Sequence, residues 1–230
     1  MGTTRIFLIA ISLFLLKATG AFAQHSIGLR GGFNLSSVKN FPLDGVEGHL
    51  TEGVTFGNYN ALSFEIGLSE RFAFQPEITY LQKGGKIGLA DNDDYSFTVK
   101  LDYLEMPLLA KWRLGSGAFK GYLIAGPSFG YALTGETSLR ADGLRRKDNI
   151  DFDSSFGPDG RKDNRFDFGF IGGGGIQYKV GPGSIVLDAR AALDLNDFTL
   201  LQNDKPDGYK ATRWEGISVS LGYQYEFGGR

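Results

Sequence analysis

The chain contains no cysteine and only two histidines, His25 and His49. The lack of cysteine excludes disulfide bonds, thiol nucleophiles and zinc sites built on thiolates. Neither histidine lies on an expected strand where it could activate a serine, so the sequence offers no acyl-transfer site. We expect both to be mobile loop residues, and we predict that the protein is not an enzyme and binds no cofactor.

The sequence also lacks a surplus of charge. Its formal net charge is −2 at pH 7, which is too small to attract nucleic acid or anionic lipid in bulk. Mean hydropathy is slightly negative at −0.15, which disfavours a bundle of membrane helices but not a membrane barrel, whose strands are half polar. Glycine, in contrast, is abundant at 34 residues, and this composition favours an all-β protein.

The one long apolar run, residues 6–16, follows the positive charge of Arg5. Ala21-Phe22-Ala23 then forms an A-x-A cleavage site, so we predict a cleaved signal peptide at residues 1–23. The run is shorter than the ~20 residues that a helical membrane anchor needs. We expect a single β-barrel domain over residues 24–230.

The clearest pattern in the mature chain is strict alternation in residues 217–227. Apolar residues occupy every second position, and small, nearly uncharged polar residues lie between them. This alternation predicts a strand with one apolar face, and the segment reaches the length of about 9–11 residues with which a tilted strand crosses a membrane. We predict that the apolar face meets lipid and that the small polar residues point into a narrow barrel.

Similar alternation recurs along the chain and predicts eight strands. They cover residues 26–35, 62–69, 72–83, 99–114, 119–133, 166–178, 184–194 and 217–227. The apolar positions in residues 99–103 have the opposite phase to those that follow, which predicts a β-bulge near Tyr103. The predicted fold is an all-β, eight-stranded, antiparallel, up-and-down transmembrane β-barrel.

The predicted connections alternate in length. The long ones are residues 36–61, 84–98, 135–164 and 195–212, and the short ones are residues 69–71, 115–118 and 179–183. In an antiparallel barrel this places every long connection at one end and both termini at the other. Outer-membrane barrels have this asymmetry, with long external loops and short periplasmic turns.

The positions predicted to face inward carry charges of both signs in nearly equal number. They are Arg30, Glu65, Glu77, Glu105, Lys111, Arg113, Asp167, Asp188, Arg190, Asp194 and Glu226. Buried charges must be paired or hydrated, and side chains fill an eight-stranded barrel. We therefore interpret these residues as a structural network of ion pairs that fixes the register, in preference to a proton or ion pathway.

Three other features of the sequence are candidate ligand sites. The acidic run at residues 91–94 lacks the glycine and distant glutamate of a calcium loop, so we interpret it as a solvated loop tip. Arg140 and residues 145–147 are basic enough to contact lipopolysaccharide, but nearby aspartates dilute the charge and favour a solvated loop. Gly172–Gly175 is followed by no lysine, so these glycines indicate tight curvature or a close approach instead of a phosphate loop.

Aromatic residues gather near the predicted strand ends, as in the interfacial belts of membrane proteins. They are Phe72, Tyr80, Tyr103, Trp112, Tyr223, Tyr225 and Phe227. This distribution supports the assignment of the apolar face to lipid.

Four stretches together resemble the PorT-like outer-membrane β-barrel family, the OmpA/OmpX-like eight-stranded barrels of Bacteroidetes-type bacteria. They are Gly28–Asn34, Phe74–Gly84, Tyr103–Trp112 with Tyr122–Gly130, and Asp167–Gly175 before the final strand. The resemblance implies an outer-membrane barrel without shared catalytic residues. It also implies an assembly signal in the terminal aromatic residues Tyr223, Tyr225 and Phe227.

Our leading functional hypothesis is a non-enzymatic outer-membrane barrel with a structural or interaction role through four long external loops. Its expected partners are outer-membrane lipid, the barrel assembly machinery during insertion and a protein at the loops, with no nucleic acid. The family name adds the alternative of a component of a protein secretion or assembly machine. A further alternative is a soluble, lipocalin-like barrel whose apolar face points inward around an apolar ligand.

Overall fold

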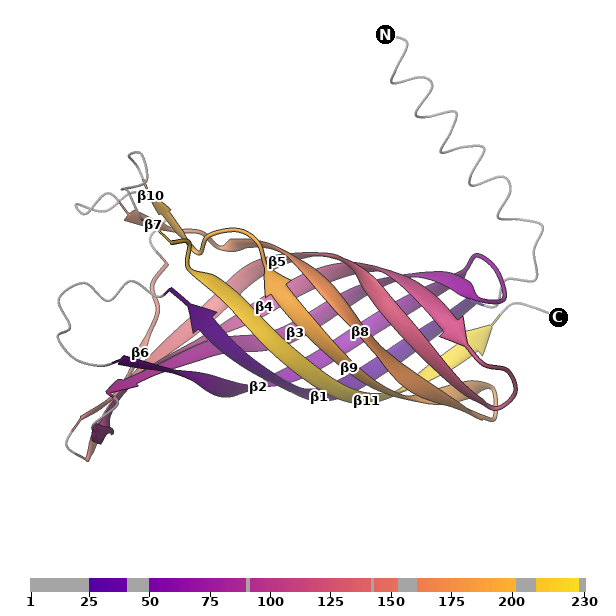
Figure 1. The fold of residues 1–230 in the computed structure, drawn as a ribbon, viewed down its shortest axis with the longest axis horizontal. Coiled ribbons are helices and arrows are strands. Elements are labelled where there is room, and N and C mark those ends of the chain that lie inside the picture. The colour runs from indigo at the N-terminus through magenta and orange to yellow at the C-terminus, as the bar shows by residue number, and fades with distance from the viewer. Residues whose placement is uncertain are drawn as a thin grey trace, which may run out of the picture.

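The computed structural model describes residues 25–40, 50–89, 92–141, 143–152, 161–201 and 210–227. The predicted signal peptide lies outside these ranges and stays a prediction. Within them, no helix has the length and apolar character needed to cross a membrane. The described chain is built from eleven strands (Figure 1).

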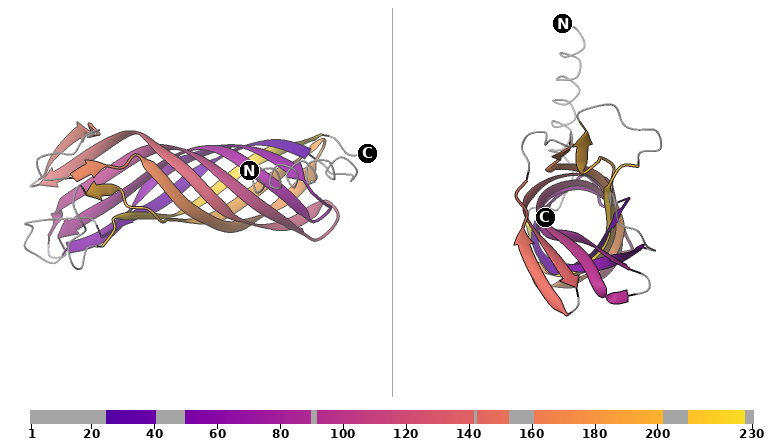
Figure 2. Two further views of the ribbon diagram at one scale, coloured as in Figure 1. Left: turned by 90° about the horizontal axis from the view of Figure 1, so that it is seen from above. Right: turned by 90° about the vertical axis from the view of Figure 1, so that its left-hand side faces the viewer.

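Eight long strands form a closed antiparallel barrel, which confirms the predicted fold class. They are β1 (His25–Lys39), β2 (Leu50–Gly67), β3 (Phe72–Leu89), β4 (Asn92–Leu114), β5 (Phe119–Ala141), β8 (Phe166–Val180), β9 (Gly183–Asp194) and β11 (Arg213–Phe227). Neighbours in this order pair with each other, and β11 pairs with β1 to close the ring, which is visible end-on in Figure 2. The short strand β6 (Leu144–Asn149) pairs with β5, and β7 (Arg161–Asp163) pairs with β10 (Thr199–Leu201).

The two ends of the barrel differ. The turns β2–β3, β4–β5 and β8–β9 are short and lie at one end, which we call the turn end (Figure 1). There His25 pairs with Phe227, so the first and last described residues lie together. Gly115 and Gly181 adopt positive φ angles of 84° and 59° in two of these turns, a conformation that glycine tolerates best. The other end, with β6, β7 and β10, we call the loop end.

The strands run further toward the loop end than the sequence pattern predicts. Most of the predicted connection at residues 84–98 is paired backbone, with Lys86 opposite Thr98. The predicted connection at residues 135–164 likewise begins with the β5–β6 hairpin. In these extensions the apolar side chains point inward, with Ile87 and Val99 each 6% exposed, and polar residues such as Lys86 point outward. The alternation therefore has the opposite phase to that of the lipid-facing wall.

The two faces of the wall have the predicted chemistry. Phe168, Leu187 and Tyr225 point outward and are 41%, 44% and 47% exposed, whereas Glu105 and Arg190 point inward and are 6% and 3% exposed. A lipocalin-like barrel needs the reverse arrangement, with apolar side chains around the axis. The soluble, ligand-enclosing alternative is therefore wrong.

The predicted bulge near Tyr103 is present, but on the neighbouring strand. Asp102 pairs with Thr134 and Tyr103 pairs with Ala132, so Leu133 of β5 is the extra residue. β4 itself keeps one phase, and Tyr103, at 1% exposed, lies inside the barrel. Its assignment to the lipid-facing aromatic belt is therefore wrong. The apolar positions in residues 99–103 do have the opposite phase, because Val99 and Leu101 also point into the barrel.

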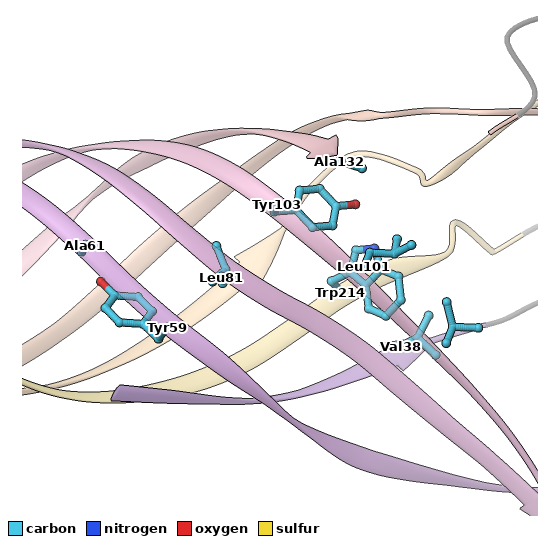
Figure 3. Close-up of a cluster of buried hydrophobic side chains, with 9 residues drawn as sticks. Val38, Tyr59, Ala61, Leu81, Leu101, Tyr103, Ala132 and Trp214 are labelled. Carbon is cyan, nitrogen blue, oxygen red and sulfur yellow. The ribbon is translucent and has the colours of Figure 1, made fainter. Parts of the chain in front are cut away.

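An apolar cluster fills the interior toward the loop end, and we call it the apolar plug (Figure 3). Its members are Val38, Tyr59, Ala61, Leu81, Val99, Leu101, Tyr103, Ala132 and Trp214. Phe97, Ile150, Phe152 and Phe198 pack against it. The interior is therefore polar over part of its length and apolar near the loop end, where the sequence pattern predicted polar residues throughout.

Candidate functional site

The charged interior of the barrel is the most concentrated set of ionisable groups in the described residues. All eleven residues predicted to face inward do so, and nine of them are fully buried. Arg113 and Glu226 remain half-buried at the turn end. All of them except Glu226 belong to three groups along the barrel axis, each organised around a different centre.

The group nearest the turn end is centred on Glu65. Lys111 Nζ lies 2.6 Å from Glu65 Oε2, and the Arg113 guanidinium binds the other carboxylate oxygen. Gln224 Nε2 also donates to Glu65, at 2.6 Å. Lys111 lies 4.2 Å from the centre of the Tyr122 ring, so a cation–π contact adds to its ion pair.

The central group consists of two carboxylates and two guanidinium groups. Arg190 Nη1 donates to Glu77 at 2.6 Å, and its Nε donates to Asp188 at 2.8 Å. Arg30 pairs with the same two carboxylates. Two planar guanidinium groups bridging two carboxylates join β1, β3 and β9 across the lumen, and the four charges cancel.

The third group contains Lys83, which is not among the residues predicted to face inward. Lys83 Nζ lies 2.7 Å from an oxygen of each of Glu105, Asp167 and Asp194. It also lies 4.7 Å from the centre of the Tyr103 ring. Every second residue of β3 points inward, so counting on from Thr79 places Leu81 and then Lys83 inside the barrel. Leu81 is apolar and belongs to the apolar plug, so it interrupts the polar pattern before Lys83.

Tyr122 connects the first two groups, and a glycine makes room for it. Its hydroxyl donates to Asp188 at 3.0 Å. A Cβ atom on Gly175 would lie 2.5 Å from the same hydroxyl oxygen and 2.3 Å from the Leu187 carbonyl oxygen. The close approach expected for the Gly172–Gly175 run is therefore realised here.

A polar cavity of about 370 Å³ opens at the turn end. Ser26, Glu65, Arg113, Gln224 and Glu226 contribute to its wall. Lys179 pairs with Glu226 at the rim, and Ser184 Oγ donates to the same carboxylate at 2.8 Å. The cavity reaches the first ion-pair group, so water entering from this end meets paired charges.

The remaining candidate ligand sites are not brought together. No cluster of metal-ligating side chains occurs in the described part of the chain. His25 begins β1 with its ring 6.3 Å from that of Phe227, so its assignment to a mobile loop is wrong, whereas His49 and Asp91 lie outside the described residues. Arg146 and Lys147 pair with Asp148 and Glu136 on the β5–β6 hairpin, each at 2.7 Å.

The other predicted belt residues face outward, five of them at the turn end and Tyr80 further toward the loop end. Phe72, Tyr80, Trp112, Tyr223, Tyr225 and Phe227 are between 40% and 53% exposed. The rings of Phe72 and Trp112 stack with centres 6.2 Å apart. An apolar wall with aromatic rims and a filled polar interior is the arrangement of a membrane barrel.

Comparison with known families agrees with this geometry. Residues 22–200 match a family model described as "Outer membrane protein beta-barrel domain". The chain belongs to this family. Membership implies an outer-membrane location, which agrees with the apolar wall. Among curated proteins, none matches the chain significantly.

This member of the outer-membrane β-barrel family is also similar to solved structures of other outer-membrane proteins. OprG from Pseudomonas aeruginosa is 15% identical, with a TM-score of 0.52 and coverage of 89% of this chain and 96% of that one. Outer membrane protein W of E. coli is 19% identical, covers 88% and 97%, and has a TM-score of 0.44. Ail of Yersinia pestis is 14% identical, covers 88% and 99%, and has a TM-score of 0.39. At 15% identity, the similarity to OprG is evidence for the fold and not for a shared function.

Proposed function

We propose that this protein is a closed, non-enzymatic outer-membrane barrel that holds its loop-end hairpins outside the cell for interaction with a partner. The observation that carries the proposal is the occluded lumen. Three ion-pair groups cross the interior, and the apolar plug lies beyond them toward the loop end. A barrel with no open path acts through its surfaces and not through transport along its axis.

The width and the chemistry of the lumen both favour occlusion. Eight strands leave an interior just wide enough for side chains. Each buried ion would cost several kcal/mol to leave unpaired, so a permeating ion cannot separate these pairs cheaply. The plug adds a section without polar groups to replace an ion's hydration shell.

Conductance in planar lipid bilayers tests this proposal. The folded protein should produce no large, stable current steps, while a porin reconstituted in parallel supplies the positive control. Heat-modifiable gel mobility of the same preparation shows that the barrel is folded. Reproducible large conductance from folded protein would contradict an occluded barrel.

A role in a protein secretion or assembly machine is a second candidate. It is favoured by the four stretches that resemble the PorT-like barrels, a finer assignment than the family itself. Crosslinking in native membranes followed by purification tests it, and we expect partner subunits to be recovered with the barrel. Repeated recovery of the barrel alone would count against it.

A further inference from the structure

The β5 strand changes its partner at the bulge. On the turn-end side of the bulge, β8 pairs with β5 as far as the pair Tyr131–Phe166. On the loop-end side of Leu133, β6 replaces β8 as the strand that pairs with this edge of β5, while β4 stays paired with the other edge. β6 is therefore the last strand of its sheet in the described part of the chain, and it lies apart from β7 and β10 at the loop end (Figure 1).

The hairpin geometry determines which backbone groups of β6 face outward. Ala141 pairs with Leu144 across a two-residue turn, and Gly143 has a φ of +77°. The residues that flank such a turn form a hydrogen-bonded pair, and such pairs then alternate along the ladder. The bond from the Ile150 N–H to the Gly135 carbonyl, at 2.8 Å, continues the same series.

The intervening residues of β6 are Arg145, Lys147 and Asn149. In an antiparallel ladder, the N–H and C=O groups of such residues point away from the partner strand. They therefore point to the open edge, where an extended segment can pair with them. All six side chains of β6 are exposed.

The charges beside this edge are not balanced. Arg140 of β5 lies directly opposite Arg145 of β6, so two like charges share one face of the hairpin. Among the described residues neither has a carboxylate partner, and Arg145 donates only to Ser138 Oγ at 3.1 Å. Like charges directly opposite each other destabilise a sheet, and an acidic side chain on a third strand would relieve this pair.

We propose that the β6 edge binds an extended acidic segment of a partner protein as an added strand, with its carboxylates against Arg140 and Arg145. The proposal rests on the interaction role proposed above and identifies its site and partner chemistry. Basic side chains on an edge deter neutral and basic strands, so they select for an acidic one. A second copy of this chain is disfavoured, because pairing β6 with β6 would bring Arg145, Arg146 and Lys147 against like charges.

Peptide binding to the full chain in zwitterionic nanodiscs tests the proposal. The probe is a fluorescein-labelled octapeptide of alternating glutamate and valine, and the readout is fluorescence anisotropy. The same peptide with its four central amides N-methylated keeps the charge but cannot pair with the edge. We expect the N-methylated peptide to bind at least about tenfold more weakly.

Matched variants locate the site. Lys147→Pro removes one outward N–H, a change that edge strands tolerate, whereas Lys147→Ala removes the same charge and keeps the N–H. We expect Lys147→Pro to weaken binding by about tenfold relative to Lys147→Ala. Arg145→Glu should weaken it similarly, whereas Lys86→Glu, an exposed position on β3, should have little effect.

Three outcomes would overturn the proposal. Equal binding of both peptides would show attraction by charge alone, and no binding of either would remove the site. Self-association that Lys147→Pro abolishes would show that the occupant is a second copy of the chain. None of these outcomes alters the bilayer measurement, so a failure here is distinguishable from a failure of the occluded-barrel proposal.

Discussion

Lys83 illustrates at the scale of single residues how the interior is balanced. Its ammonium group is the common partner of Glu105, Asp167 and Asp194. Ser128 Oγ also donates to Glu105, at 3.2 Å. Removing this cation would leave three carboxylates close together in a buried site. Removing one carboxylate would still leave Lys83 with two partners.

Lys83→Met should lower the free energy of unfolding by about 3–5 kcal/mol, because it leaves buried charge uncompensated. Urea titration of the protein in lipid vesicles, followed by tryptophan fluorescence, measures the change. Lys86→Met on the same strand is the control, and this exposed position should change stability by less than about 0.5 kcal/mol. Equal stability of the two variants would show that Lys83 does not hold the group together.

The two tryptophans test the assignment of the faces. Trp112 is 43% exposed on the outer wall, and Trp214 is 3% exposed in the apolar plug. In bilayers whose acyl chains carry bromine, Trp214→Phe should leave a strongly quenched emission from Trp112. Trp112→Phe should leave an emission from Trp214 that changes little, and strong quenching of it would contradict the plug.

At the scale of elements, β11 completes the barrel by pairing with β1 on one side and β9 on the other. Its last three outward residues, Tyr223, Tyr225 and Phe227, lie at the turn end. We propose that they form the signal read by the barrel assembly machinery, because they end the strand whose pairing closes the ring.

Phe227→Ala should reduce the fraction of protein that assembles in the outer membrane, because it removes the final ring of this signal. The fraction is measured by heat-modifiable mobility in isolated membranes. Phe168→Ala is the matched control, since Phe168 is also lipid-facing, at 41% against 49% exposed, but does not end a strand at the turn end. The same loss in both variants would indicate lost lipid contact and not a lost signal.

At the scale of the whole molecule, the barrel has two different ends and one occluded interior. The turn end carries the polar cavity and the paired termini of the wall. The loop end carries the hairpin edge proposed above as a docking site. We propose that the loop end faces the outside of the cell, as the long external loops of outer-membrane barrels do.

Single cysteines test this orientation, because the chain has no cysteine of its own. Leu144→Cys, at a position that is 77% exposed, should react with a membrane-impermeant maleimide on intact cells. Ser116→Cys, in a turn-end loop, should react only after the outer membrane is permeabilised. Ser220→Cys, at a position that is 2% exposed in the lumen, should stay unreactive in both cases, and labelling of it on intact cells would contradict the occluded lumen.

The strands within the membrane could be predicted because lipid imposes a strict period of two. Residues 217–227 show this most clearly, and β11 covers all of them. The inward charges could be found by the same period. The strand extensions could not be found, because their alternation is reversed: Ile87 and Val99 are buried inside, whereas Lys86 is exposed on the outer face.

Sequence alone thus determined the number of strands in the barrel, the two faces of the wall and the ends at which the connections lie, since each depends on whether a side chain meets lipid. Only the tertiary structure decided which charges pair, because Lys83 and Asp194 are 111 residues apart and meet across the lumen. It also decided that Tyr103 packs in the plug and that β6 ends a sheet. Those outcomes depend on the register between strands and on the diameter of the closed ring, which local patterns do not encode.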